Sequence, residues 1–407
     1  MKISRLWTTY HPVVNTLLIG TLFAVIAEGM SVPFLAIYLA DRLHLDPGTI
    51  GLILGLSALA GTFGGFLGGM LSDFLGRKNV LICTLVTLIG IFVGFQVISN
   101  VIAIFILSII LGLSTSCYHP VSKSMIADYV QPERRMRIFS IRYILINIGF
   151  TVGVPLGAML GFQNNASAFL ATAFIYLIYA IFLFLILYRF DNKENSTGPK
   201  AEKLELGSAL RTLRTDVVLR FLVVGGIFSV IVYQRISTIL AQYLHGQFAD
   251  GVKMYTVLMV INGLTVVTLQ YLVTRFAEKW TPYKSIVIGS ILLCMGSVGF
   301  AFSLGWATLI VSMFIFTLGE MFIVPAQYIA IDRITPDGLR GMYYGAQTFT
   351  SIGSFIGPWL GGLLLGWYGG EVVFLTLAVI SLFAIYFYSR STHVQNNPVA
   401  SQDSLSS

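Results

Sequence analysis

The sequence predicts an all-α integral membrane protein with twelve transmembrane helices in two pseudo-symmetric six-helix bundles. The first indication is composition: 56% of the 407 residues are hydrophobic and only 11% are charged, whereas soluble domains contain about 25% charged residues. The second is a repeat between the two halves of the chain. Because open backbone groups find no partners in lipid, every apolar run that crosses the bilayer must be helical.

Runs of about 20 apolar residues, long enough to cross the hydrocarbon core as helices, follow one another along the chain. The predicted spans are 13–40, 47–71, 79–98, 101–126, 138–162, 166–189, 217–245, 251–276, 284–303, 305–329, 342–367 and 371–390. The first run is too long for a cleaved signal segment. The polar stretches then divide the chain into a bundle over 1–189, a linker over 190–216, a bundle over 217–390 and a disordered tail over 391–407.

The lysines and arginines predict the orientation. Nineteen lie before the first span, in the linker or tail, or in loops on that side, and two, Arg42 and Lys253, lie on the opposite side. Positive residues gather on the cytoplasmic side of membrane proteins, so both termini are expected there, in a bacterial inner (cytoplasmic) membrane. The net charge of +7 therefore reflects topology, and we expect no nucleic-acid partner.

The two halves are related by a shift of 204 residues. Five landmarks coincide at this offset: Asp128 with Asp332, Pro132 with Pro336, Gly149 with Gly353, Gly153 with Gly357 and Gly157 with Gly361. Repeated bundles of this kind are typical of transporters that bind substrate at the interface between the repeats. Glycines four residues apart also clear a strip on a helix for close packing, which serves either static packing or sliding helices.

A charged loop interrupts the apolar sequence between the second and third spans. It reads Gly69-x-x-x-Asp73-x-x-Gly76-Arg77-Lys78 and resembles the signature loop of the major facilitator superfamily. The resemblance implies a latch in which Asp73 meets a helix N-terminus and Arg77 and Lys78 reach a carboxylate such as Asp128. Under the alternative interpretation, Arg77 and Lys78 only follow the positive-inside rule, which leaves Asp73 and Gly76 unexplained.

Two later segments are similar to the drug:proton antiporter branch of that superfamily. The fifth span contains Gly153-Val-Pro155-Leu-Gly157, and the eleventh contains Gly357-Pro358-x-x-Gly361-Gly362. The chain departs from the branch at Ser108, where an arginine is usual, and in the loop LVTRFAEKW between the eighth and ninth spans. The resemblance implies an exporter of drugs, short peptides or similar metabolites.

Few charges lie inside the spans, where each costs about 2.5–3.5 kcal/mol on insertion scales and needs a partner, water or a function. We predict proton-coupling roles for Glu28, Glu320 and His119. The alternative is fixed ion pairing for the carboxylates and a satisfied polar side chain for His119. Arg142 and Arg235 either bind a substrate carboxylate or neutralise these acids. Nearby polar side chains that can line the site are Tyr118, Tyr143, Asn147, Tyr233, Gln234, Asn262 and Gln327.

The predicted function is export of a small amphipathic or zwitterionic molecule by proton antiport through alternating access. Two carboxylates and two guanidiniums leave the cavity nearly neutral, which favours zwitterions over simple cations. The sequence lacks a GxxxxGK[ST] loop and an HExxH motif, so we expect neither ATP, metal nor another cofactor. Alternatives are a uniporter or importer of a small polar metabolite and, less favoured, a membrane-embedded enzyme. The expected partners are substrate, protons and lipid, and nothing demands more than a monomer.

Overall fold

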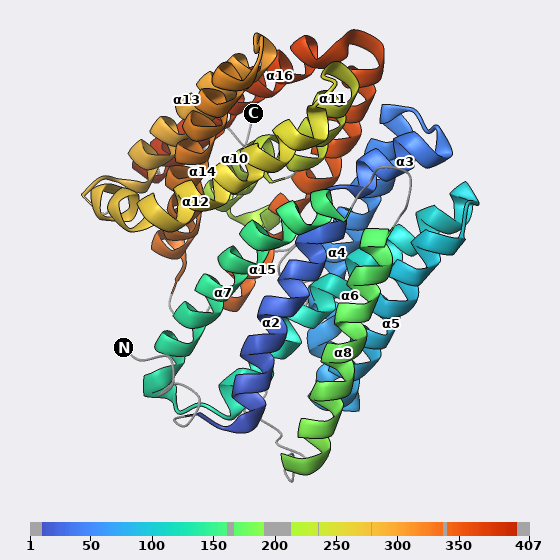
Figure 1. The fold of residues 1–407 in the computed structure, drawn as a ribbon. Helices are drawn as coiled ribbons and strands as arrows, with labels where there is room; N and C mark the ends of the chain where they lie inside the picture. The colour runs from blue at the N-terminus through green and yellow to red at the C-terminus, as the bar shows by residue number, and fades with distance from the viewer. Residues whose placement is uncertain are drawn as a thin grey trace. The chain divides into compact units, whose positions relative to one another are not determined.

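The computed structural model describes residues 10–160, 167–190, 213–234, 236–277, 279–336 and 340–396, where every regular element is a helix (Figure 1). The chain forms two compact units, one of Met1–Asp46, Leu56–Lys200 and Leu244–Gly263, the other of Pro47–Gly55, Ala201–Tyr243 and Leu264–Ser407. Most of the first predicted bundle falls in the first unit and most of the second bundle in the second. Most of the predicted linker, 191–212, lies outside the described residues.

The N-terminal repeat begins with α2, whose first turn carries Pro12 and is capped by the His11 side chain. Asn100 caps α6 by accepting from the Ala103 amide. Between α4 and α5, Gly76 has φ 83°, a left-handed backbone conformation that strongly favours glycine. The helices are α2 (Pro12–Ser31), α3 (Leu35–Leu43), α4 (Pro47–Leu75), α5 (Arg77–Val97), α6 (Val101–Asp128), α7 (Pro132–Met159) and α8 (Ser167–Phe190).

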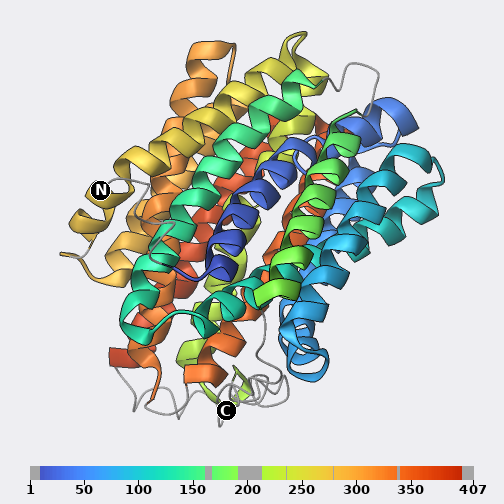
Figure 2. The same cartoon turned by 60° about the horizontal axis from the view of Figure 1, so that its bottom comes forward.

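Helix α2 packs between α7 and α8, and α5 packs on α6 and α8 (Figure 2). The glycine strip of the fifth span lies against α2: a Cβ at Gly153 would meet the Ile26 carbonyl oxygen, and one at Gly157 would meet the carbonyl of Met30. Pro155 lies within the same helix. Glycine at these positions therefore lets the backbones of α2 and α7 approach each other closely.

Several helices of the C-terminal repeat begin or end at positions equivalent to those of the N-terminal repeat. At the offset of 204, the ends of α3 and α5 coincide with those of α11 and α13, and the start of α4 with that of α12. The elements are α10 (Val217–Tyr233), α11 (Ile236–Gln247), α12 (Gly251–Ala277), α13 (Pro282–Ala301), α14 (Trp306–Ile334), α15 (Arg340–Gln347), the 3₁₀ turn η1 (Thr348–Ser351) and α16 (Ile352–Asn396).

In the second unit α10 packs on α16, and α13 packs on α14 and α16. A Cβ at Gly357 would lie 2.8 Å from the Ile231 carbonyl oxygen, and one at Gly361 would meet the Ile239 side chain. The carbonyl of Pro358 lies against Gly51, within the same unit. The predicted packing glycines of both repeats thus face neighbouring backbone or side chains.

Two predicted spans are not single helices. The first is broken between α2 and α3 at Val32–Phe34, where Pro33 lacks the backbone donor that would continue the α-helix. In the seventh, the first helix ends at Tyr233, shortly before 236–238, the positions equivalent to the first break at the offset of 204. Arg235, beside this break, lies outside the described residues.

Eleven helices of the described chain are long and apolar enough to cross a membrane. One of these stretches, Tyr343–Val394, has 52 residues, far more than a bilayer requires. It is interrupted at Gly369, where φ is 79°, between the predicted eleventh and twelfth spans. Helix α16 continues to Asn396, past the predicted end at residue 390, and residues 397–407 lie outside the described part.

Candidate functional site

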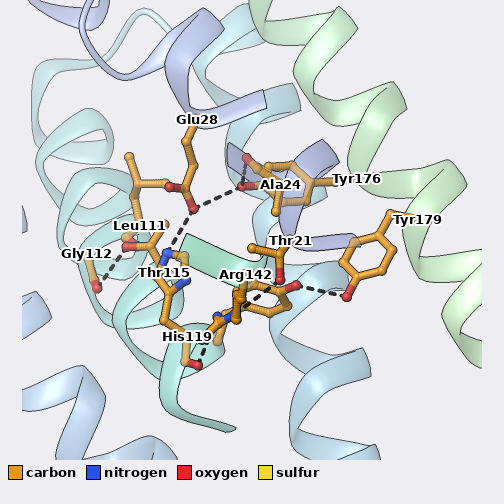
Figure 3. Close-up of polar contacts among 11 residues, drawn as sticks. Thr21, Ala24, Glu28, Leu111, Gly112, Thr115, His119, Arg142, Tyr176 and Tyr179 are labelled. Carbon is orange, nitrogen blue, oxygen red and sulfur yellow. Dashed lines mark hydrogen bonds and ion pairs between the residues drawn. The ribbon is translucent and has the colours of Figure 1, made fainter. Parts of the chain in front are cut away.

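Glu28 and His119 meet inside the first unit (Figure 3). Glu28 comes from α2 and His119 from α6, and Nε2 of the imidazole lies 3.5 Å from Oε1 of the carboxylate. The Tyr176 hydroxyl on α8 donates to the same oxygen at 3.4 Å and lies 3.4 Å from the Ala24 carbonyl oxygen. The Glu28 side chain is 21% exposed and that of His119 36%. The carboxylate therefore has partners on two neighbouring helices and retains access to its surroundings.

Arg142 of α7 lies in the same network and is only 7% exposed (Figure 3). Its Nε donates to Thr21 Oγ1 and its Nη2 to the His119 carbonyl oxygen, each at 3.3 Å. The charges of Arg142 and Glu28 interact, but no described carboxylate lies within 4.0 Å of the guanidinium. A buried guanidinium held by neutral oxygens keeps its affinity for an anionic group.

Two tyrosines extend this network. The hydroxyls of Tyr118 on α6 and Tyr179 on α8 share a hydrogen bond of 2.8 Å. Tyr118, like Tyr176, is almost completely buried. The hydrogen bond between these two tyrosines connects α6 and α8 beside the charged groups.

In the second unit, Tyr233 and Gln327 form a smaller polar contact. The Tyr233 hydroxyl donates to Gln327 Oε1 at 3.3 Å, and within the described chain Gln327 Nε2 is buried without a hydrogen-bond partner. Glu320 lies two turns before Gln327 on α14, is half-buried and interacts electrostatically with Tyr233. These residues form a second polar group, which belongs to the second unit, whereas the Glu28 network belongs to the first.

The other predicted lining residues are Tyr143, Asn147, Gln234 and Asn262. Tyr143 is 53% exposed, and the Asn147 amide donates to the Tyr143 carbonyl oxygen within α7. Gln234 is exposed beside the break after α10, and Asn262 is half-buried on α12. Their roles stay predictions.

The predicted latch is partly assembled. Arg77 forms an ion pair with Asp128, and its Nη1 also donates to the Ser124 carbonyl oxygen at 3.0 Å. Both charged side chains are about a quarter exposed. The Lys78 ammonium lies 6.0 Å from the centre of the Tyr188 ring, so it contacts an aromatic face rather than Asp128. Gly69 and Asp73 belong to α4, but the surroundings of these two residues lie outside what the structure describes.

The positions of this ion pair differ in the second repeat. The residue equivalent to Arg77 is Thr281, which caps α13 by accepting from the Lys284 amide at 3.2 Å. Asp332, equivalent to Asp128, accepts from the Tyr344 hydroxyl at 3.0 Å. The arginine that pairs with Asp128 in the N-terminal repeat therefore has no charged equivalent at the offset of 204.

Sequence reasoning missed Thr21, Tyr176 and Tyr179. Tyr176 and Tyr179 lie three residues apart, on one face of the apolar helix α8. Two hydroxyls on one face of so apolar a helix were a detectable pattern. Thr21 lies seven residues, or two turns, before Glu28 on the same face of α2. This spacing could have indicated that Thr21 lies near the charged network.

The family follows from comparison of the whole chain. A model of the Major Facilitator Superfamily matches residues 17–350. The chain belongs to this superfamily. Among Major Facilitator Superfamily proteins, an uncharacterized transporter of Bacillus subtilis, YqjV, is 30% identical over 387 residues, covering 94% of each chain. The family consists of membrane transporters, and the chain is accordingly a transporter rather than an enzyme.

More distant superfamily members have named activities. The Na(+), Li(+), K(+)/H(+) antiporter of Planococcus maritimus is 25% identical, covering 93% of this chain and 95% of its own length. The quinolone resistance protein NorA of Staphylococcus aureus is 22% identical, covering 86% and 89%. Among solved structures, the nucleoside transporter NupG superposes with a TM-score of 0.81 at 15% identity, covering 94% of this chain and 99% of its own. The superfamily fold is thus shared over nearly the full length.

Proposed function

We propose that this Major Facilitator Superfamily transporter exports a small zwitterionic or amphipathic molecule in exchange for protons. The observation that carries the proposal is the Glu28–His119 pair inside the first unit, with the buried Arg142 in the same network. Intramembrane ionisable residues are typically functional. Two relatives are named as an antiporter and a quinolone resistance protein, and these names support exchange and export.

Glu28 is the proposed proton carrier. As a carboxylate it attracts a protonated His119 or the ammonium group of a substrate; once protonated, it attracts neither strongly. Proton and substrate cation therefore exclude one another at Glu28, which is the requirement for exchange. Tyr176 donates to the carboxylate oxygen in the structure and keeps the side chain in place. Glu320, half-buried on α14, is a secondary candidate.

Arg142 is the proposed site for the anionic group of the substrate. Two of its donor nitrogens are held by neutral oxygens of Thr21 and His119, which orient the guanidinium without neutralising it. A molecule with both an ammonium and a carboxylate then matches Glu28 and Arg142 together.

The test uses the purified protein in proteoliposomes that contain a pH-sensitive dye. Norfloxacin, a zwitterionic quinolone, and ethidium, a lipophilic cation, are added separately to wild type, Glu28→Gln and the matched control Glu371→Gln, which removes an exposed carboxylate on α16. We expect norfloxacin to drive proton movement in wild type and in the control. In Glu28→Gln, proton movement should fall at least about tenfold, equivalent to about 1.4 kcal/mol.

Two results would contradict the proposal. Norfloxacin flux without proton movement, unchanged by Glu28→Gln, would make the protein a facilitator. A response to ethidium but none to norfloxacin would exclude the zwitterionic class of substrate. In either case the superfamily fold would be unaffected.

A further inference from the structure

The Thr21 hydroxyl on α2 has both of its hydrogen-bonding roles fixed. Its Oγ1 lies 2.8 Å from the Leu17 carbonyl oxygen, which can only accept, so the hydroxyl hydrogen is donated there. The lone pairs of the same oxygen then accept from the Arg142 Nε at 3.3 Å. Thr21 is completely buried. It therefore presents Arg142 with a neutral oxygen that can only accept.

The second acceptor of Arg142 is also held in place. It is the backbone carbonyl oxygen of His119, whose ring centroid lies 5.4 Å from that of the buried Tyr118. The Tyr118 hydroxyl is hydrogen-bonded to Tyr179 (Figure 3). The Tyr179 ring packs directly on the α2 backbone at Gly20, where an added Cβ would lie 2.0 Å from two ring carbons. Packing among α2, α6 and α8 thus fixes both acceptors.

These two bonds leave most of the guanidinium donors open. A guanidinium carries five N–H donors in one plane, and Arg142 uses the one on Nε and one of the two on Nη2. Two donors on Nη1 and one on Nη2 remain, and no residue that the structure describes accepts from them. The Glu28 carboxylate faces His119 and Tyr176 instead. The open donors therefore lie on the two terminal nitrogens of Arg142.

Two terminal nitrogens with open donors match a carboxylate. Its two oxygens lie in one plane and accept two parallel N–H···O bonds from a guanidinium. A carboxamide of the same shape offers one oxygen, and its NH2 group places donors against the donors of Arg142. Because Thr21 and the His119 carbonyl are neutral, the carboxylate also gains the full attraction of the guanidinium charge.

We propose that Thr21 is a positioning residue that makes Arg142 selective for a carboxylate. The hydroxyl holds the Nε side of the guanidinium, so that the two terminal nitrogens remain available to the ligand. Without this acceptor the guanidinium can rotate and offer the ligand the single donor of Nε. The inference rests on the proposed function in placing the anionic group of the substrate at Arg142, but it requires neither proton exchange nor a direction of transport.

Chemical modification of Arg142 tests the inference without a transport assay. Phenylglyoxal condenses with the terminal nitrogens of guanidinium groups, and mass spectrometry of the digested protein reports its reaction at each arginine. The purified protein is modified in detergent micelles over a range of concentrations of benzoate, or of benzamide, in which an amide replaces the carboxylate. We expect benzoate to slow the modification of Arg142 in wild type and benzamide to leave it unchanged.

Three variants assign this selectivity to the Thr21 hydroxyl. Thr21→Val keeps the side-chain shape without the hydroxyl, and the benzoate concentration for half-maximal protection should rise at least about tenfold. Thr21→Ser keeps the hydroxyl and should remain within about twofold of wild type. The matched control is Thr84→Val on α5, because Thr84 is also buried and donates to the carbonyl four residues earlier, that of Val80, at 2.6 Å. It should leave the protection unchanged.

Three results would overturn the assignment: no protection by benzoate in wild type, equal protection by benzamide, or undiminished protection in Thr21→Val. Modification of Arg220, which donates to two backbone carbonyls on the exposed start of α10, reports folding in the same samples. If Thr21→Val also accelerates the reaction at Arg220, Thr21→Ala replaces it with the same expectation.

The outcome is separable from that of the proteoliposome experiment. Benzoate protection that depends on Thr21, together with no substrate-driven proton movement, would contradict the proposed exchange and leave the carboxylate site standing. Proton movement that depends on Glu28, together with equal protection by benzoate and benzamide, would contradict the role of Thr21 alone.

Discussion

Position by position, the charged network of the N-terminal repeat corresponds to apolar residues in the C-terminal repeat. At the offset of 204 the equivalents are Val232 for Glu28, Ile323 for His119, Ala346 for Arg142, Gly225 for Thr21 and Phe383 for Tyr179. Several helix ends, by contrast, coincide between the repeats, such as those of α3 with α11 and α5 with α13. The packing scaffold has therefore been kept in both copies, whereas the intramembrane charges of this network are present in one.

Concentrating charges in one repeat has an energetic reason. Each charge carried into the membrane costs free energy unless it shares hydrogen bonds and opposite charges. Glu28, His119 and Arg142 share their partners: Arg142 donates to the His119 carbonyl, and His119 faces Glu28. One network with shared partners costs less than two isolated copies.

The largest difference is expected in proton movement. His119→Gln removes the only charge His119 can carry but keeps a polar side chain, so substrate-driven proton movement should fall roughly three- to tenfold, about 0.7–1.4 kcal/mol. Glu320→Gln in the other repeat should remain within about twofold of wild type. The dye-loaded proteoliposomes measure both. A larger loss in Glu320→Gln than in His119→Gln would reverse the assignment of proton coupling to the N-terminal repeat.

In stability, rather than transport, the larger difference is expected between the two loop contacts. Arg77→Gln leaves the partly buried Asp128 carboxylate without its cation, and the free energy of unfolding should fall by about 1–3 kcal/mol. Tyr344→Phe removes one hydroxyl from the exposed Asp332 and should cost less than about 1 kcal/mol. Denaturation in detergent micelles measures both, with Lys78→Gln as the control for losing a positive charge from the same loop. Equal costs for the two variants would contradict the difference between the loops.

The smallest difference concerns two buried tyrosines. Tyr118→Phe breaks the hydrogen bond to Tyr179 and should cost about 0.6 kcal/mol, the average for side-chain hydrogen bonds in one membrane protein. The buried Tyr388 hydroxyl on α16 lies near Ser229 and Gln327 but forms no hydrogen bond of standard geometry with a described residue. Tyr388→Phe should therefore leave stability unchanged or raise it slightly. A marked loss of thermal stability in Tyr388→Phe would indicate a partner for this hydroxyl.

Much of the architecture was predictable because lipid imposes it. Apolar runs of sufficient length must be helices, and the offset of 204 already indicated the repeat. The breaks in the first and seventh spans were not predicted. Pro33 offered a local indication for the first, but no proline stands at the second, near Tyr233. Only the repeat itself, which copies the break of the first span, indicated the second.

The site was predictable where charges stand out against an apolar background. Glu28, His119 and Arg142 were candidates for that reason, and the structure brings them into one network. Their neutral partners, such as Tyr176, stand out less, because tyrosine is common in apolar helices and its contacts depend on packing; the spacing of Tyr176 and Tyr179 on α8 was the only indication. Tyr143 is as polar as Tyr118, yet the structure leaves it exposed, since helix rotation rather than residue type decides which way each points.

The Arg77–Asp128 ion pair also carries information about history. If the repeat arose by duplication of a single six-helix ancestor, both copies initially had the same residues at these two positions. The aspartate is present in both copies, as Asp128 and Asp332, whereas the partner position is Arg77 in one and Thr281 in the other. One copy therefore changed at the partner position after the duplication, and the difference between the two loops is younger than the repeat itself.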